Sequence, residues 1–165
     1  MNKITETAIE ADPKLPVIRM ARDFAATPEQ LFRAHTDPAL FARWVGPDAL
    51  TTRIEHWDAQ TGGSWRYVSV HDGTEYRFRG CFHEVRPDRI VQTFTFEGDP
   101  DGVALETLSF ESLGDGHTRL RFTQNYATEL SDDDYGVYNY NWGYYLESLR
   151  LLCTSGAGKP FRAAQ

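Results

Sequence analysis

The feature that most constrains the fold is a series of six segments in which apolar and polar residues alternate. They span residues 51–58, 64–71, 74–85, 89–97, 104–112 and 117–126. Alternation with a period of two is typical of strands that bury one face. The separators are short and rich in turn residues, among them Asp72 with Gly73 and Asp115 with Gly116. Such connections join antiparallel neighbours, so the series predicts one antiparallel sheet.

Two short helices are predicted between a first strand, over residues 16–25, and this series. Thr27 and Asp37 each stand directly before a proline. A capping side chain followed by proline is typical of a helix start. Gly46 and Pro47 end the second of these helices.

The last predicted element is a long helix that begins at Ser131. Three aspartates follow that residue, and the positive end of a helix dipole favours acidic side chains there. Apolar and aromatic residues then recur at helical spacing and form one broad stripe: Tyr138, Trp142, Tyr145, Leu146, Leu149 and Leu152.

Together these elements predict a single α+β domain over residues 15–155, with a flexible N-terminal arm at 1–14 and a C-terminal tail at 156–165. A curved antiparallel sheet of seven strands would wrap around the long C-terminal helix, because an apolar sheet face needs a cover. One helix is about 10 Å wide and cannot fill the concave face of such a sheet. We therefore expect a cavity between the sheet and the helix.

Composition excludes several classes of function. The formal net charge is −7, and the basic residues are scattered among more numerous acids, so we expect no nucleic-acid partner. The chain shows neither the roughly 18–20 consecutive apolar residues of a membrane-spanning helix nor the apolar core of a signal peptide. We expect no membrane insertion and a cytoplasmic location. The two cysteines, Cys81 and Cys153, are expected to be free thiols.

The sequence shows no catalytic or metal-binding constellation. Its five histidines have none of the compact spacings of a zinc site, and the chain has no nucleophile signature. The acidic run at residues 131–134 is better explained as a helix cap than as a metal site, because one short turn supplies too few converging oxygens. We predict no metal, no cofactor and no catalytic residue.

Aromatic residues are the most informative candidates for a binding site. Each of them is also an ordinary core residue, but a buried Tyr or Trp needs a hydrogen-bond partner, so several facing one space indicate a pocket. Gln124 continues the inward face that Leu120 and Phe122 begin, and His56 either points inward or is an ordinary strand residue. The predicted ligand-binding residues are Trp44, His56, Tyr67, Tyr76, Phe78, Phe94, Gln124, Tyr138, Trp142 and Tyr145.

Several motifs resemble those of a known superfamily. They are residues 41–47 (FARWVGP), 62–67 (GGSWRY), 72–80 (DGTEYRFRG), 84–91 (EVRPDRIV) and 113–120 (LGDGHTRL), with Trp142, Leu146 and Leu149 on the helix. In this order the set is similar to the START-like SRPBCC superfamily, and most similar to its family of small bacterial homologues of the heat-shock-protein-90 ATPase activator. The resemblance implies the helix-grip fold and binding of lipids or other hydrophobic ligands. One departure is Gly143, which follows the tryptophan here instead of preceding it.

Three functions are compatible with these observations. The first, which we expect, is binding of a small hydrophobic or aromatic molecule in the cavity. The second is a cyclase- or aromatase-like enzyme, with Tyr67, Tyr76, Gln124 and His56 as candidates for proton transfer. The third is a co-factor of the chaperone ATPase, although we expect no chaperone interaction because the N-terminal chaperone-binding segment of the eukaryotic activator is lacking. A homodimer is compatible with all three.

Overall fold

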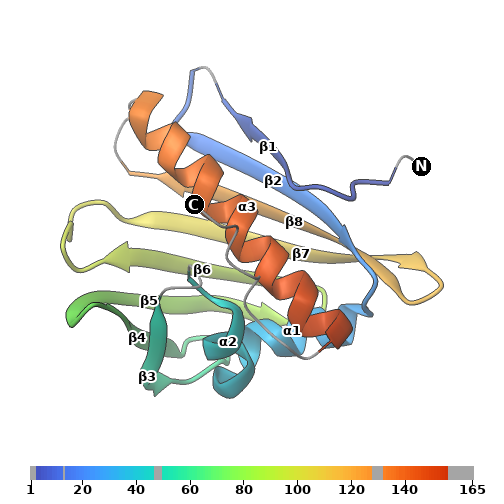
Figure 1. Cartoon of the computed structure of the whole chain (residues 1–165), viewed down its shortest axis with the longest axis horizontal. Coiled ribbons are helices and arrows are strands. Elements are labelled where there is room, and N and C mark those ends of the chain that lie inside the picture. Colours follow the sequence, from blue (N-terminus) through green and yellow to red (C-terminus); the bar gives the residue numbers. More distant parts are fainter. Residues whose placement is uncertain (1–2, 13, 47–49, 128–131, 156–165) are drawn as a thin grey trace.

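One antiparallel sheet of eight strands forms the body of the molecule, and helix α3 (Asp132–Ser155) crosses its concave face (Figure 1). The computed structural model describes residues 3–12, 14–46, 50–127 and 132–155. The strands follow the sheet order β1-β2-β8-β7-β6-β5-β4-β3. Their bounds are β1 Ala8–Ala11, β2 Val17–Phe24, β3 Thr51–Trp57, β4 Ser64–His71, β5 Thr74–Arg86, β6 Arg89–Phe96, β7 Ala104–Gly114 and β8 His117–Tyr126.

This architecture confirms the predicted α+β class, the antiparallel sheet, the two short helices and the C-terminal helix. The predicted number of seven strands is wrong, because residues of the expected N-terminal arm form β1. This strand lies at the edge of the sheet and pairs with β2, with Ala8 opposite Ala21. Only Ile9 of β1 packs against the core, so the segment shows no alternation that would reveal a strand. The predicted C-terminal tail lies outside the described residues.

Helices α1 (Pro28–Thr36) and α2 (Pro38–Trp44) close one end of the sheet, beside the C-terminal end of α3 (Figure 1). Thr27, the predicted cap, forms a capping box with Gln30 at the start of α1. Asp37 ends α1 and also caps α2, where its carboxylate accepts the Ala39 N–H at 2.9 Å. A shared cap of this kind fixes the turn between the two helices, which brings side chains of both toward the same space.

The core lies between the sheet and α3. Leu146 and Leu149 of the helix are buried in one cluster with the inward residues of β2, β7 and β8: Ile18, Met20, Phe24, Leu108, Phe110, Leu120 and Phe122. Arg22 shares this inward face of β2 and pairs with Glu147 of α3. Both cysteines are free, as predicted. In the part of the chain that is described, no helix has the length and apolar content that a membrane span requires.

Candidate functional site

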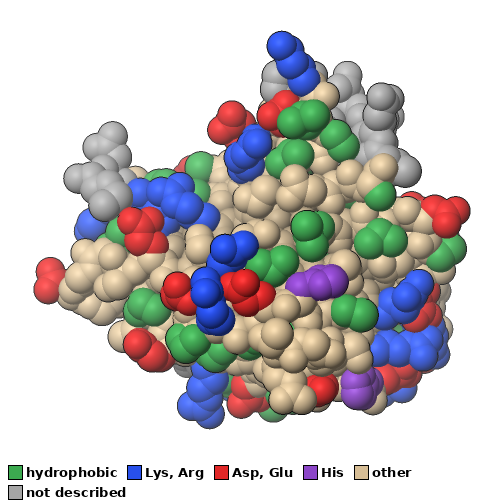
Figure 2. All heavy atoms as spheres, turned by 180° about the vertical axis from the view of Figure 1, so that it is seen from behind, with side chains coloured by type: hydrophobic (Ala, Val, Ile, Leu, Met, Phe, Trp, Pro, Cys, Tyr) green, Lys and Arg blue, Asp and Glu red, His purple; other side chains and the backbone are tan. Residues whose placement is uncertain are grey.

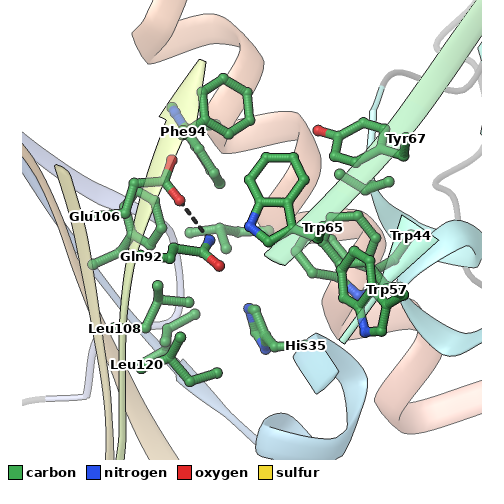
Figure 3. A pocket seen from close by; sticks show the side chains of 16 residues that line it. His35, Trp44, Trp57, Trp65, Tyr67, Gln92, Phe94, Glu106, Leu108 and Leu120 are labelled. Atoms are coloured by element: carbon green, nitrogen blue, oxygen red, sulfur yellow. Dashed lines mark hydrogen bonds between the residues drawn. The ribbon is translucent and has the colours of Figure 1, made fainter. Parts of the chain in front are cut away.

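A buried cavity lies on the concave side of the sheet, beneath α3 (Figure 3). We call it the inner cavity. Its volume is about 40 Å³, which is room for a few waters. Its walls come from both short helices, from β3, β4 and β6–β8, and from α3: His35, Phe41, Trp44, Val45, Trp57, Trp65, Tyr67, Ile90, Gln92, Phe94, Glu106, Leu108, Leu120, Phe122, Trp142 and Leu146.

A second, more open hollow adjoins it, which we call the outer pocket. Its volume is about 470 Å³. Aromatic side chains of β5, β6, β8 and α3 dominate its lining, which consists of Tyr76, Phe78, Phe94, Phe96, Asp99, Gly102, Gln124, Tyr126, Trp142 and Tyr145. Phe94 and Trp142 line both spaces. These two side chains therefore stand between the inner cavity and the outer pocket.

Strand register explains why the aromatic rings gather here. Trp65 and Tyr67 are two positions apart on β4 and therefore point to the same face of the sheet. Tyr67 lies directly opposite Phe78 of β5. The rings stack in sequence, with centroids 5.4 Å apart for Trp65 and Tyr67 and 5.0 Å apart for Tyr67 and Phe78. Gly80 lies opposite Trp65, and a side chain at that position would overlap the indole. The glycine thus allows Trp65 to lie across β5.

A row of three polar side chains crosses the floor of this apolar site. Gln92, Glu106 and Gln124 lie directly opposite one another on β6, β7 and β8. Each amide donates to one oxygen of the Glu106 carboxyl, Gln92 at 2.8 Å and Gln124 at 2.7 Å. The carbonyl of Gln124 in turn accepts the hydroxyl of Tyr126 at 2.7 Å and the indole N–H of Trp142 at 3.1 Å. Through Gln124, the row therefore connects the inner cavity to Trp142, which separates this cavity from the outer pocket.

Glu106 is a buried acid, only 2% exposed. Burial raises the pKa of its carboxyl to about 7, although the hydrogen bonds from Gln92 and Gln124 act in the opposite direction. Within the described ranges, Glu106 forms no ion pair with Lys or Arg. The group can therefore change its protonation state near neutral pH, a property found often at functional sites.

Other polar groups line the same cavity. His35 bonds through Nδ1 to the carbonyl of Leu31 at 2.7 Å, and burial lowers the pKa of its ring to about 4, so the imidazole is neutral at pH 7. Burial also raises the pKa of the Tyr67 hydroxyl well above its usual value, and the nearby Tyr145 and Glu106 add to this shift. Trp65 is 3% exposed, and its indole Nε1 has no hydrogen-bond partner among the described residues. A buried N–H without a partner is uncommon in a native protein.

The structure brings together eight of the ten predicted site residues. Trp44, Tyr67, Phe94 and Trp142 line the inner cavity, whereas Tyr76, Phe78, Gln124 and Tyr145 join Phe94 and Trp142 around the outer pocket. The side chain of Tyr138 lies outside the described part of the chain. That these residues bind a ligand stays a prediction.

His56 does not lie in the cavity. A bulge in β3 between Ile54 and His56 shifts the register against β4 by one residue, so that Trp57 points inward instead. His56 is exposed, bonds to Ser64 Oγ at 3.1 Å and belongs to a shallow hollow on the outer face of the sheet. Because one residue of slip turns a side chain to the other face, its assignment as an inward candidate is corrected.

The outer, convex face differs in character from the concave one. Figure 2 shows acidic and basic side chains interspersed on this side of the molecule. Some charged side chains form ion pairs that reach across one intervening strand, as Arg53 of β3 does with Glu75 of β5 at 3.0 Å and Arg66 of β4 with Glu97, directly after β6, at 2.9 Å. No group of three or more His, Cys, Asp or Glu side chains within the described ranges is arranged to hold a metal. The candidate site is therefore the concave side.

Sequence reasoning missed Gln92, Glu106 and Trp65 as site residues. A signal for the first two was present, because each interrupts the inward apolar face of its strand. Glu106 falls between Ala104 and Leu108, and Gln92 has the same relation to its own neighbours two positions away. A polar residue at an inward position needs a partner, and here the two are partners of each other.

Comparison with known proteins gives consistent results. Residues 25–153 match the family model described as "Activator of Hsp90 ATPase homolog 1-like protein". A crystal structure of a protein from Chromobacterium violaceum is similar, with a TM-score of 0.74 and 28% identity over 84% of this chain and 96% of that one. A solution structure from Staphylococcus epidermidis has a TM-score of 0.79 and 22% identity over 95% and 99% of the two chains. A search of curated proteins gave no match.

Proposed function

The chain belongs to the family of Activator of Hsp90 ATPase homolog 1-like proteins, and from this premise we propose that it binds one small hydrophobic or aromatic molecule. The ligand occupies the outer pocket and extends past Phe94 and Trp142 into the inner cavity. The observation that carries this proposal is that two aromatic-lined spaces meet at these two side chains.

Size and chemistry support the proposal. Ligand sites are typically clefts of about 300–1,000 Å³ that combine apolar walls with a few polar groups, and the outer pocket falls in this range at about 470 Å³. The inner cavity alone is too small for such a molecule. Among the described residues, Trp142 donates a hydrogen bond of 3.1 Å to Gln124 and packs against the rings of Phe122 and Tyr145. A rotation of this indole would join the two spaces and would give up this hydrogen bond, which contributes about 0.5–1.5 kcal/mol net, together with the two ring contacts.

The test uses N-phenyl-1-naphthylamine, a neutral aromatic probe whose fluorescence rises in apolar surroundings. We expect saturable binding of one probe per chain. Substituting Phe94→Ala or Tyr145→Ala removes contact area in the outer pocket and should weaken binding about tenfold, equivalent to about 1.4 kcal/mol. Leu105→Ala is the matched control, because Leu105 is exposed and lies outside both spaces. A signal that does not saturate, or one that the pocket substitutions leave unchanged, would contradict the proposal.

A second candidate function is proton transfer in the same cavity, favoured by one observation. Glu106 is a carboxyl with a pKa of about 7 in an apolar site, which suits a general base near neutral pH. An experiment can follow the exchange of the C1 protons of 2-tetralone for deuterium by NMR. A rate enhancement that Glu106→Gln abolishes would support an enzyme, and equal rates for the two proteins would contradict it.

A further inference from the structure

The inner cavity contains a buried hydrogen-bond donor that no described residue uses. Nε1 of Trp65 is buried and has no partner in the described part of the chain. The ring cannot easily turn to find one, because it lies across Gly80 on one side and stacks on Tyr67 on the other. Figure 3 shows the indole nitrogen on the side of the ring that faces Gln92 and Glu106. The donor thus points into the cavity and remains available to a bound group.

The same cavity contains acceptor capacity that is not used. The Glu106 carboxylate accepts one hydrogen bond on each oxygen, from Gln92 and from Gln124. An ionised carboxylate has about four lone-pair positions, so two of them remain. The titratable side chains that face this region from other elements are His35, Tyr67 and Tyr145. None of these is a cation at neutral pH, because the His35 ring has a pKa of about 4. No side chain among these supplies a counter-charge, so the open positions can accept a hydrogen bond from a bound ligand.

A donor and an acceptor consequently face one small space. Trp65 and Glu106 both line the inner cavity, whose volume of about 40 Å³ admits a small polar group of a ligand. A hydroxyl is the simplest group that accepts and donates at once. A ketone oxygen would satisfy Trp65 and leave the carboxylate unmatched, an ammonium would do the reverse, and a methyl group would match neither.

We infer that Trp65 and Glu106 form a subsite for a hydroxyl group, so that the ligand is an aromatic alcohol or phenol. This inference rests on the proposed function, because it names the chemical class of the molecule that the cavity takes. The hydroxyl oxygen accepts the Trp65 Nε1–H and its proton is donated to Glu106. The apolar body of the ligand then passes between Phe94 and Trp142 toward the outer pocket.

The test compares two ligands of nearly equal size that differ in one group. 2-Naphthol donates and accepts through its hydroxyl, whereas 2-fluoronaphthalene carries a fluorine at that position. Each competes with N-phenyl-1-naphthylamine at pH 8, where the naphthol is still neutral and Glu106 is largely ionised. We expect 2-naphthol to bind at least tenfold more tightly. We expect its advantage to shrink on acidification to pH 5.5, because a neutral carboxyl is a weaker acceptor of the hydroxyl proton than a carboxylate.

Two substitutions test whether Trp65 and Glu106 produce the preference for 2-naphthol. Trp65→Phe removes the donor and Glu106→Gln removes the charge, and each should reduce the preference for 2-naphthol to less than threefold. The affinity for 2-fluoronaphthalene should stay within threefold of the wild type in Glu106→Gln, which shows that the pocket is intact. Glu111→Gln is the matched control, because Glu111 is exposed on the opposite face of the same strand, β7.

The outcomes distinguish a failure of the hydroxyl subsite from a failure of ligand binding as a whole. Equal binding of the two naphthalenes by the wild type, or a preference that persists in both variants, overturns the hydroxyl subsite and leaves ligand binding standing. Failure of both naphthalenes and of the probe to bind overturns the proposed function and the subsite together. A preference that is lost in Trp65→Phe and Glu106→Gln, but kept in Glu111→Gln, supports the subsite.

Discussion

The side-chain amide of Gln124 donates a hydrogen bond of 2.7 Å to the buried carboxyl of Glu106. The carbonyl oxygen of the same amide accepts the indole N–H of Trp142, which stands between the inner cavity and the outer pocket. One amide therefore contacts both the buried acid and the aromatic partition. The protonation of the acid, the position of the partition and the occupancy of the cavity are expected to depend on one another.

The first prediction concerns the stability cost of the buried acid. The pKa of Glu106 is raised by burial from 4.5 to about 7. The stability that comes from its neutral form is complete below pH 4.5 and is lost as the pH rises through 7. The Glu106→Gln variant has no charge to bury and does not lose this stability. The free energy of unfolding of the wild type should therefore fall relative to that of the variant by about 3 kcal/mol between pH 4.5 and pH 8. Urea denaturation at these pH values measures the difference, and parallel curves for the two proteins would contradict it.

The second prediction concerns His35. Its ring lies against Trp44 and Phe110, with centroids 5.0 and 5.4 Å away, and burial lowers its pKa from 6.5 to about 4. The stability contributed by the neutral ring is present above pH 6.5 and is lost as the pH falls toward 4. NMR titration of the ring protons should show a neutral imidazole down to about pH 4. A midpoint close to that of free histidine would mean that the ring is not buried in this way.

The third prediction tests how α3 is held on the sheet. Arg22 is 6% exposed on the inner face of β2 and pairs with Glu147, which also bonds to Arg150. Glu147→Gln leaves the buried guanidinium without its counter-charge. Because Glu147 is about one third exposed, we expect a loss of about 2 kcal/mol, less than for a fully buried pair. Glu111→Gln, whose partner Arg121 is exposed, should lose under about 1 kcal/mol. Equal losses in chemical denaturation would show that the pair does not anchor the helix.

The fourth prediction compares two glycines. A Cβ at Gly80 would overlap the indole of Trp65 and the carbonyl oxygen of Thr93, so Gly80→Ala should destabilise the fold by about 1–3 kcal/mol and alter Trp fluorescence. A Cβ at Gly143 in α3 would meet no atom within 4 Å, so Gly143→Ala should stabilise the helix by about 0.5–1 kcal/mol. Thermal unfolding of both variants measures the contrast. A tolerated Gly80→Ala would mean that Trp65 does not lie across β5.

Period-two alternation was sufficient to predict most of the sheet and the inward direction of Tyr67, Phe78 and Phe94, because one buried face imposes that pattern. It failed where the backbone departs from regular pairing. The bulge before His56 turned that side chain outward, and a bulge has no reliable signature in a single sequence. The edge strand β1 is too exposed to carry a pattern.

The polar part of the site was harder to anticipate for a different reason. Glu106 interrupts an apolar face, which a reading of the sequence can detect, but its meaning depends on the residues opposite it on β6 and β8. Trp65 looks like any inward aromatic residue in the sequence. Only the packing over Gly80 and the position of its nitrogen show that its N–H is unpartnered in the described structure.

The hydroxyl subsite, and with it the position of the ligand's rings, is tested most directly by a crystal structure of the protein with 2-naphthol. The account predicts electron density for the naphthalene rings between Phe94 and Trp142, with the hydroxyl oxygen at about 2.7–3.2 Å from both Trp65 Nε1 and a Glu106 oxygen. It would be contradicted by a ligand bound elsewhere on the molecule while Trp142 remains on Gln124 and the inner cavity stays closed.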